Sequence, residues 1–248
     1  MKKFGLIGHP IAHSLSPALF KAAYDGKYAY DLIEGEDFET SYRRFIEEYD
    51  AINVTAPFKE AAFAKADILS EECASTGATN LLVKTPEGIK AYNSDFLGVR
   101  MWLSEVTEDL KGVKILIVGL GGAGKAAAAA AESLGMDVIR MNRTVRNSQT
   151  HPLDDFRKCF RKANIIIYNI PAAIPELKEL TDSDFNEDKP KLILEANYKD
   201  PSLRETMESF GSKAVYTGGE TWLLYQAMTG YKILTGEKPD LTKMSDVL

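Results

Sequence analysis

Lys59 and Asp95 are the residues whose types and positions could carry acid–base chemistry. Lys59 ends the segment Asn53-Val-Thr-Ala-Pro-Phe-Lys, in which a strand ends and the chain turns through proline, and Asp95 ends Asn93-Ser-Asp after a later strand. Sites in α/β sheets gather beyond the carboxyl ends of strands, so we expect the two side chains to face one another. Such a pair could orient a substrate hydroxyl and transfer its proton. Either residue taken alone would be ordinary solvated surface.

A glycine-rich turn lies between a predicted strand and a predicted helix. The apolar run Lys114–Val118 leads into Gly119-Leu-Gly-Gly-Ala-Gly-Lys, and six alanines follow. Glycine in such a turn lets backbone N–H groups approach a pyrophosphate at the positive end of the helix. The same turn could serve packing alone, but its place after a strand and before a helix favours a dinucleotide. The expected contacts are Gly119, Gly121, Gly122 and Ala123.

The end of the next strand indicates which dinucleotide would bind. Asp137–Met141 is followed by Asn142-Arg-Thr, at the distance from the turn where an NAD site usually places Asp or Glu. Amide and guanidinium groups favour a ribose 2′-phosphate instead, which predicts NADP. Without the glycine turn, Arg143 and Arg146 would be interpreted as ordinary solvated loop residues. The expected contacts at this end are Asn142, Arg143, Thr144 and Arg146.

Composition limits the classes of protein that fit. The 248 residues are 45% hydrophobic, enough for one large or two modest domains, and the net charge of -6 argues against general affinity for nucleic acid or acidic membranes. Cys73 and Cys159 are far apart in the sequence, so we expect buried thiols and no metal site. The longest apolar stretch, Ile115–Gly124, is too short to cross a bilayer, and no export signal is evident. The protein is predicted to be cytoplasmic.

Short apolar runs rich in β-branched residues alternate with helical patterns, which predicts an α/β fold of parallel strands joined by crossover helices. In the first half, strands are expected at Phe4–Ile7, Tyr30–Ile33, Ala51–Val54, Asn80–Val83 and Ile89–Tyr92, and helices at Ser16–Tyr24, Phe38–Glu48 and Ala61–Ala64. In the second half, strands are expected at Lys114–Val118, Asp137–Met141, Asn164–Tyr168, Leu192–Ala196 and Lys213–Tyr216, with a helix at Lys125–Leu134. A polar break at Thr107–Gly112 divides the domains 1–106 and 107–219, and a last helix, Glu220–Thr235, could join either.

Seven motifs spread along the chain resemble the shikimate dehydrogenase family. They are Gly8-His-Pro-Ile-Ala-His-Ser-Leu-Ser-Pro, Asn53-Val-Thr-Ala-Pro-Phe-Lys, Gly77-Ala-Thr-Asn, Asn93-Ser-Asp with Gly98, Gly119-Leu-Gly-Gly-Ala, Asn142-Arg-Thr, and Gly219 through Gln226. The resemblance implies an N-terminal α/β substrate domain, a Rossmann-type doubly wound NADP domain, a C-terminal segment 220–248 that returns to the substrate domain, and an active site between the domains. It also implies NADPH-dependent, reversible reduction of 3-dehydroshikimate to shikimate, on the route to chorismate and aromatic amino acids.

The resemblance also implies roles for single residues. Lys59 and Asp95 would be the catalytic pair, with Lys59 handling the proton of the reacting oxygen, and Ser14 and Ser16 would hold the substrate carboxylate. The remaining substrate contacts would be Thr55, Asn80, Tyr198 and Gln226, and Gly219 would join the cofactor site. Such hydroxyl, amide, amine and carboxylate groups suit a small polyhydroxylated acid. From the residues alone, Ser16 before Pro17 could be a helix N-cap, and Gln226 a polar position on the last helix.

Several positions depart from the family's pattern and leave room for altered specificity. Leu81, Trp222 and Glu195 stand where Thr, Met and Asp are usual, and Phe20-Lys21 replaces a common His-Asn pair. The alternatives are a quinate/shikimate dehydrogenase or shikimate dehydrogenase-like enzyme and, in another class, an NADP-binding regulator without turnover. Retention of both catalytic candidates counts against the regulator. The expected partners are a small-molecule substrate and NADP, with no nucleic acid or membrane, in a monomer or homodimer.

Overall fold

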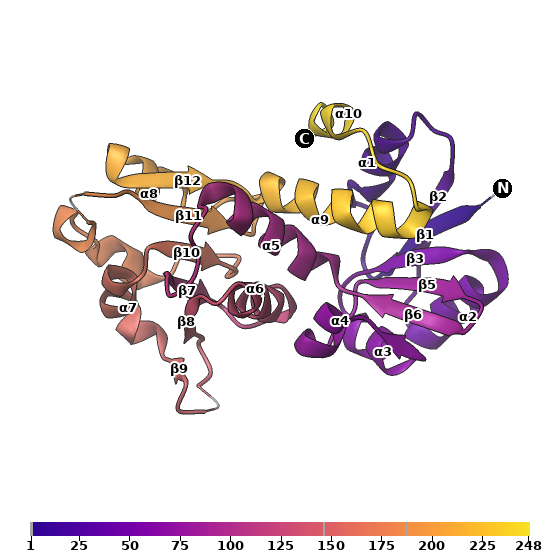
Figure 1. Cartoon of the computed structure of the whole chain (residues 1–248), viewed down its shortest axis with the longest axis horizontal. Helices are drawn as coiled ribbons and strands as arrows, with labels where there is room; N and C mark the ends of the chain where they lie inside the picture. The colour runs from indigo at the N-terminus through magenta and orange to yellow at the C-terminus, as the bar shows by residue number, and fades with distance from the viewer. Residues whose placement is uncertain (1, 146, 187) are drawn as a thin grey trace. The chain divides into compact units, whose positions relative to one another are not determined.

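Two six-stranded sheets organise the chain (Figure 1), for which a computed structural model describes residues 2–145, 147–186 and 188–248. Internal contacts divide it into two compact units, Met1–Gly98 with Leu224–Leu248, and Val99–Leu223. The division falls inside two helices, α5 (Ser94–Val106) and α9 (Gly219–Thr235). The C-terminal segment thus belongs to the same unit as the N-terminal part of the chain, while the assignment of substrate and cofactor to the two units stays a prediction.

The sheet of the first unit is mixed. Its strands run in the order β2-β1-β3-β5-β6-β4, with bounds β1 Lys3–Gly8, β2 Ala29–Glu34, β3 Ala51–Val54, β4 Ile68–Leu69, β5 Leu81–Thr85 and β6 Gly88–Tyr92. The expectation of parallel strands is wrong for β5, which pairs antiparallel with both β3 and β6. Only Pro86 and Glu87 connect β5 to β6, and two residues can close a hairpin but not a crossover. The two-residue strand β4 was not predicted.

The helices of the first unit are short. Besides its parts of α5 and α9 it contains α1 (Ser16–Ala23), α2 (Phe38–Glu48), α3 (Lys59–Ala64), α4 (Glu71–Thr76) and α10 (Leu241–Ser245). Asp37 caps α2 by accepting a hydrogen bond from the Thr40 backbone N–H at 2.8 Å. Sequence periodicity did not predict α4 and α10, because five or six residues complete less than two helical turns.

An aromatic cluster in the first unit explains one departure from the family's pattern. Phe20 is 1% exposed, and its ring centroid lies 4.6 Å from that of Tyr30 and 4.8 Å from that of Tyr231. Tyr231, on α9, donates a hydrogen bond from its hydroxyl to the Ser16 carbonyl at 3.1 Å. Phe20 is therefore a core residue that holds α9 against α1.

The sheet of the second unit is wholly parallel and has the Rossmann strand order. The strands run β12-β11-β10-β7-β8-β9, with bounds β7 Lys114–Val118, β8 Asp137–Met141, β9 Thr150–His151, β10 Ile165–Tyr168, β11 Lys191–Glu195 and β12 Ala214–Thr217. In chain order this is 3-2-1-4-5-6, with the switch point between β7 and β10. The predicted doubly wound unit is confirmed, and the two-residue β9 is an addition to it.

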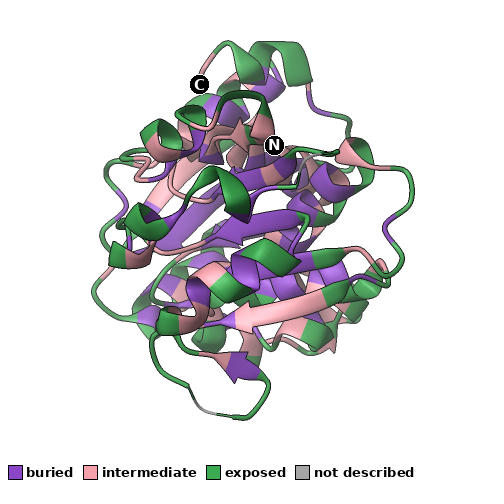
Figure 2. Cartoon of the chain, turned by 90° about the vertical axis from the view of Figure 1, so that its left-hand side faces the viewer, coloured by how far each residue is buried: buried purple, intermediate pink, exposed green. Residues whose placement is uncertain are grey.

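The helices of the second unit pack on this sheet through small and apolar side chains. They are α6 (Gly122–Ser133), α7 (Phe156–Lys162) and α8 (Arg204–Glu208), with 3-10 turns at Leu153–Asp155, Pro175–Glu179, Asp182–Asp184 and Gly211–Lys213. The alanines of α6 are mostly buried and let the helix lie close to β7, β8 and β10. Figure 2 shows the buried strands with exposed residues on the outer elements.

Both cysteines are buried thiols, as predicted, and burial raises the pKa of Cys73 to about 11. Across the described ranges of the chain, no helix is long and apolar enough to span a membrane.

Candidate functional site

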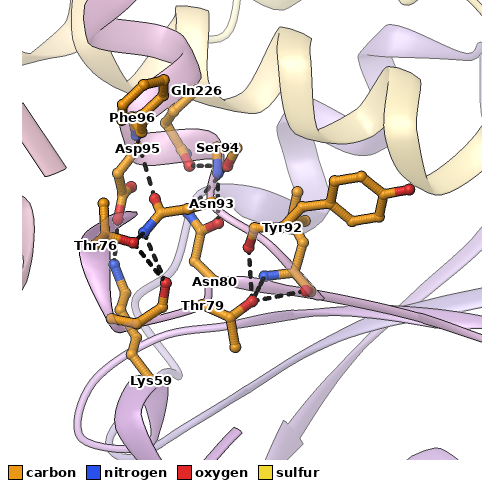
Figure 3. Close-up of polar contacts among 12 residues, drawn as sticks. Lys59, Thr76, Thr79, Asn80, Tyr92, Asn93, Ser94, Asp95, Phe96 and Gln226 are labelled. Carbon is orange, nitrogen blue, oxygen red and sulfur yellow. Dashed lines mark hydrogen bonds and ion pairs between the residues drawn. The ribbon is translucent and has the colours of Figure 1, made fainter. Parts of the chain in front are cut away.

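The Lys59 and Asp95 side chains form an ion pair in the first unit, as Figure 3 shows. Lys59 is the first residue of α3, which follows the turn at Ala56-Pro57, and Asp95 is the second residue of α5. The Phe58 N–H donates to the Thr55 carbonyl at 3.0 Å and closes that turn. The two side chains are only 23% and 15% exposed, so water screens the pair less than it would a surface salt bridge. The juxtaposition expected from the sequence is present.

Asn93 fixes the start of α5 and so the position of Asp95. Its Oδ1 accepts a hydrogen bond from the Phe96 N–H at 3.2 Å, which caps the helix. Its Nδ2 donates to the Thr76 hydroxyl at 3.0 Å and to the Ala78 carbonyl at 2.9 Å. Asn93 belongs to one of the sequence motifs, but no role was predicted for it. An asparagine between a strand end and a helix start was the available signal.

Three buried or half-buried side chains beside this pair form one hydrogen-bonded series (Figure 3). Asn80 Nδ2 donates to Ser94 Oγ at 2.9 Å, the Ser94 N–H donates to Asn80 Oδ1 at 2.7 Å, and Ser94 Oγ donates to Gln226 Oε1 at 3.2 Å. Helices α5 and α9 approach closely here, because a Cβ at Gly98 on α5 would lie 2.7 Å from the backbone nitrogen of Gln226 on α9. The series therefore joins two predicted substrate contacts, Asn80 and Gln226, through Ser94, a residue the sequence prediction passed over.

Ser14 and Ser16 hydrogen-bond to one another. Ser14 Oγ donates to Ser16 Oγ at 3.1 Å and accepts from the Ser16 N–H at 3.2 Å. The interpretation of Ser16 as an N-cap is wrong: α1 begins at Ser16, its N-cap is Leu15, and no side chain caps it. Leu15 already has helical φ and ψ of -79° and -9°, so the chain enters the helix one residue earlier than the proline suggested. Capping thus does not occupy the Ser16 hydroxyl.

The glycine turn of the second unit contains two kinds of glycine. Gly119 has φ +88°, and a Cβ at Gly124 would lie 1.8 Å from the Gly119 carbonyl oxygen, so the fold itself requires both. A Cβ at Gly121 or at Gly122 would meet nothing within 4 Å. Gly121 is the N-cap of α6 and has φ -70°, which any residue can adopt. The open space at the start of α6 fits a bound pyrophosphate, which needs close approach to the backbone.

Asn142 connects the end of β8 to the glycine turn. Its Oδ1 accepts from the Leu120 N–H at 3.3 Å, and its Nδ2 donates to the Thr144 carbonyl at 3.1 Å. Arg143 and Thr144 are exposed beside it. Arg146 lies outside the described residues. The arrangement fits a site for the ribose end of a dinucleotide, with no Asp or Glu among residues 142–144.

Glu195 holds the segment that carries Tyr198. Its carboxylate is fully buried and accepts from the Ser202 N–H at 2.6 Å, the Leu203 N–H at 3.1 Å and the Tyr216 hydroxyl at 2.7 Å. Glu195 stands where the family usually has Asp, and both of its carboxylate oxygens accept hydrogen bonds within the second unit. Tyr198 itself is half-buried, and burial raises the pKa of its hydroxyl.

Gly219 has a packing reason for its lack of a side chain. A Cβ there would lie 2.5 Å from the Ala196 carbonyl oxygen, so glycine lets α9 begin against the segment that follows β11. Its predicted contact with the cofactor stays a prediction.

Known families cover both halves of the chain. Residues 6–82 match the shikimate dehydrogenase substrate binding domain, and residues 88–194 match the NAD binding domain of D-isomer specific 2-hydroxyacid dehydrogenases. The shikimate dehydrogenase (NADP(+)) of Thermotoga maritima is 30% identical over 248 residues, which cover 93% of this chain and 92% of that protein. The chain belongs to the shikimate dehydrogenase family. The enzyme of the same name from Staphylococcus aureus is 31% identical and covers 98% of this chain and 96% of its own.

Solved structures of this family have the same fold. That of Thermus thermophilus shikimate 5-dehydrogenase in complex with NADP(H) and shikimate has a TM-score of 0.82 and 26% identity, covering 100% of this chain and 98% of that one. The Mycobacterium tuberculosis shikimate dehydrogenase structure has a TM-score of 0.80 and 26% identity, with the same coverage. The family, the fold class and the oxidoreductase class predicted from the sequence are confirmed.

The structure gathers some of the predicted site residues more tightly than others. Four contacts bring them together: Lys59 with Asp95, Ser14 with Ser16, Asn80 with Gln226 through Ser94, and Asn142 with the glycine turn. Within the described ranges, the side chains of Thr55 and Tyr198 make no hydrogen bond to another predicted site residue, and the roles of these two residues in binding stay predictions. Among the same described residues, no group of three or more His, Cys, Asp or Glu could hold a metal.

Substitutions in the glycine turn should separate fold from ligand binding. Gly121→Ser places a favoured N-cap residue in open space, so we expect an unchanged or slightly raised Tm and at least about tenfold weaker NADP binding. Gly124→Ala brings a methyl group against the Gly119 carbonyl and should lower the Tm. Thermal unfolding and NADP titration measure both. Unchanged NADP affinity in Gly121→Ser would contradict a pyrophosphate at this turn.

Proposed function

We propose that this chain catalyses the reversible NADPH-dependent reduction of 3-dehydroshikimate to shikimate, on the route to chorismate and aromatic amino acids. The observation that carries the proposal is the partly buried Lys59–Asp95 pair, set beside neutral hydroxyl and amide groups in the first unit. Family membership supports it, as does the solved relative described in complex with NADP(H) and shikimate. A polyhydroxylated acid needs many neutral hydrogen-bonding groups and few charges, which is the composition of this set.

Different polar groups would bind different parts of the substrate. Ser14 and Ser16 would hold the carboxylate, since two hydroxyls on a short turn can both donate to it. The ring hydroxyls would be bound by Thr55, Asn80, Tyr198 and Gln226. Thr55 directly follows β3, and Asn80 directly precedes β5.

Lys59 would supply the proton that completes the reduction. As the carbonyl carbon accepts a hydride, its oxygen gains negative charge, and the ammonium group of Lys59 can stabilise that charge and donate a proton to the oxygen. Asp95 would keep the ammonium in place through their ion pair and would accept a hydrogen bond from a neighbouring substrate hydroxyl. In the oxidative direction, the neutral amine of Lys59 would take the hydroxyl proton.

NADPH supplies the hydride when it is bound. The residues that would hold the cofactor are Gly119, Gly121, Gly122 and Ala123 at the pyrophosphate, Asn142, Arg143, Thr144 and Arg146 at the 2′-phosphate, and Gly219. The space that a side chain at Gly121 would fill is the structural feature that fits this group.

An absorbance assay of NADPH formation with shikimate and NADP tests the proposal, with quinate and NAD as alternative substrate and cofactor. We expect turnover with shikimate and a preference for NADP over NAD. A folded preparation that binds NADP and yet turns over no shikimate would defeat the proposal and favour a regulator. Faster turnover with quinate than with shikimate would assign the chain to the quinate/shikimate type.

Other expectations accompany the proposal as predictions. They are a cytoplasmic location, no binding to nucleic acid or membranes, and a monomeric or homodimeric state. Light scattering on the purified chain measures the last of these.

A further inference from the structure

We propose that Ser94 is a positioning residue that sets the orientation of the Gln226 side-chain amide. In this arrangement Gln226 turns Oε1 toward Ser94 and presents Nε2, a pure hydrogen-bond donor, to an oxygen of the substrate. The inference rests on the proposed function, because it names which atom of Gln226 contacts the substrate and what holds it there.

The orientation of the Asn80 amide follows from a neighbouring donor whose identity is certain. A backbone N–H can only donate, and the Ser94 N–H lies 2.7 Å from one end of the Asn80 amide. That end must therefore be the oxygen, Oδ1. The other end, 2.9 Å from Ser94 Oγ, must be Nδ2, which can only donate. The orientation of Asn80 is thus fixed by the backbone.

The orientation of Asn80 in turn determines the Ser94 hydroxyl proton. Ser94 Oγ receives a hydrogen bond from Asn80, and Ser94 is 0% exposed, so water cannot take its own proton. Within the described part of the chain, the remaining side-chain partner of Ser94 Oγ is Gln226, at 3.2 Å. With Nε2 turned to Ser94, the buried O–H would lose its acceptor, which costs more than an ordinary hydrogen bond contributes. Oε1 therefore faces Ser94.

The backbone around Gln226 lies close against α5. A Cβ at Gly98 would lie 2.7 Å from the Gln226 nitrogen and 2.9 Å from its Cα, so α5 and α9 are in direct backbone contact there. One turn further along α9, a Cβ at Gly230 would lie 3.1 Å from Ser94 Oγ. Close packing of α5 and α9 thus brings Ser94 and Gln226 together, and rotation of the side-chain amide is a simple response to loss of the Ser94 hydroxyl.

This orientation has a consequence for what the site can bind. The Nε2 donor of Gln226 can hydrogen-bond to a carboxylate oxygen or to a hydroxyl oxygen. It cannot pair with a group that only donates hydrogen bonds. Ser94 would contribute to this selection without touching the substrate, since its hydroxyl is used by Asn80 and Gln226.

A double-mutant cycle tests whether Ser94 acts through Gln226. In the full-length protein with saturating NADP, we expect Ser94→Ala to raise the KM for shikimate about tenfold, because the amide is then free to rotate. We expect kcat to change by less than about threefold, since the catalytic pair is untouched. In a Gln226→Ala background, Ser94→Ala should change KM by less than about threefold. Ser41→Ala, which removes another buried hydroxyl, should leave KM unchanged.

An NMR measurement tests the expected contact between Gln226 and the substrate, and it does not depend on the stability of the Ser94 variant. In the wild type, the side-chain amide signals of Gln226, assigned by their loss in Gln226→Ala, should shift when shikimate is added, because Nε2 gains an acceptor. Unshifted signals in a sample that binds shikimate would overturn the proposal. So would a wild-type KM in folded Ser94→Ala, or an effect of Ser94→Ala that persists without Gln226. If the wild type turns over no shikimate, the proposed function fails and this inference fails with it.

Discussion

Lys59→Ala is expected to lower kcat for shikimate oxidation by about 10²- to 10⁴-fold, the range for loss of a general acid or base. The methyl group of alanine cannot take the hydroxyl proton as the hydride departs, whereas the amine of Lys59 could. KM for shikimate should change by less than about threefold, because the predicted serine and amide contacts with the substrate remain. Steady-state kinetics at saturating NADP separates the two parameters.

Lys65 offers a matched control at the other end of the same helix. Its Nζ also pairs with a carboxylate, that of Glu39 at 3.0 Å, but the two side chains are 40% and 65% exposed. Lys65→Ala should therefore leave both kcat and KM unchanged, since exposed pairs contribute little. A large rise in KM with kcat retained in Lys59→Ala would make Lys59 a binding residue and would remove the central chemical step from the proposal.

The parts of the fold that the sequence predicted well carry their signal locally. β7 has four consecutive buried apolar residues, and the alanines after the glycine turn form a helix with small side chains against the sheet. The two-residue strands and the helices α4 and α10 are too short for a periodic pattern to be visible. The strand at β5 was predicted, but its antiparallel direction was missed, although the short connection between the two predicted strands favours a hairpin over a crossover.

The motifs of the site could be predicted from the sequence, but the contacts between residues of different motifs could not. Asp95 was identified as a carboxylate at a strand end, whereas the role of its neighbour Ser94 depends on Gln226, 132 residues away in the sequence. No local pattern specifies a contact over that distance. The glycine turn shows the same limit, because Gly121 and Gly124 look alike in the sequence. Only the space around each one distinguishes a glycine that the fold requires from one that leaves room for a ligand.

The preference for NADP over NAD should depend on Arg143. Arg143→Ala is expected to raise the KM for NADP roughly tenfold to a hundredfold, because a charge-assisted hydrogen bond to the 2′-phosphate contributes about 1.5–3 kcal/mol. The KM for NAD, which lacks that phosphate, should stay nearly constant. Arg143 is exposed and next to Asn142, whose side chain is hydrogen-bonded to the glycine turn, which places Arg143 near the predicted cofactor site.

Arg140 provides the comparison that isolates this effect from net charge. It lies on β8 itself, and its guanidinium pairs with Glu132 of α6 within the same unit. Arg140→Ala removes one positive charge, as Arg143→Ala does, and should leave the ratio of the two cofactor KM values unchanged. Raising the ionic strength should weaken NADP binding more in the wild type than in Arg143→Ala, because an exposed ion pair is screened by salt. Equal losses with NADP and NAD in Arg143→Ala would show that Arg143 contacts a part common to both cofactors, and the 2′-phosphate assignment would be wrong.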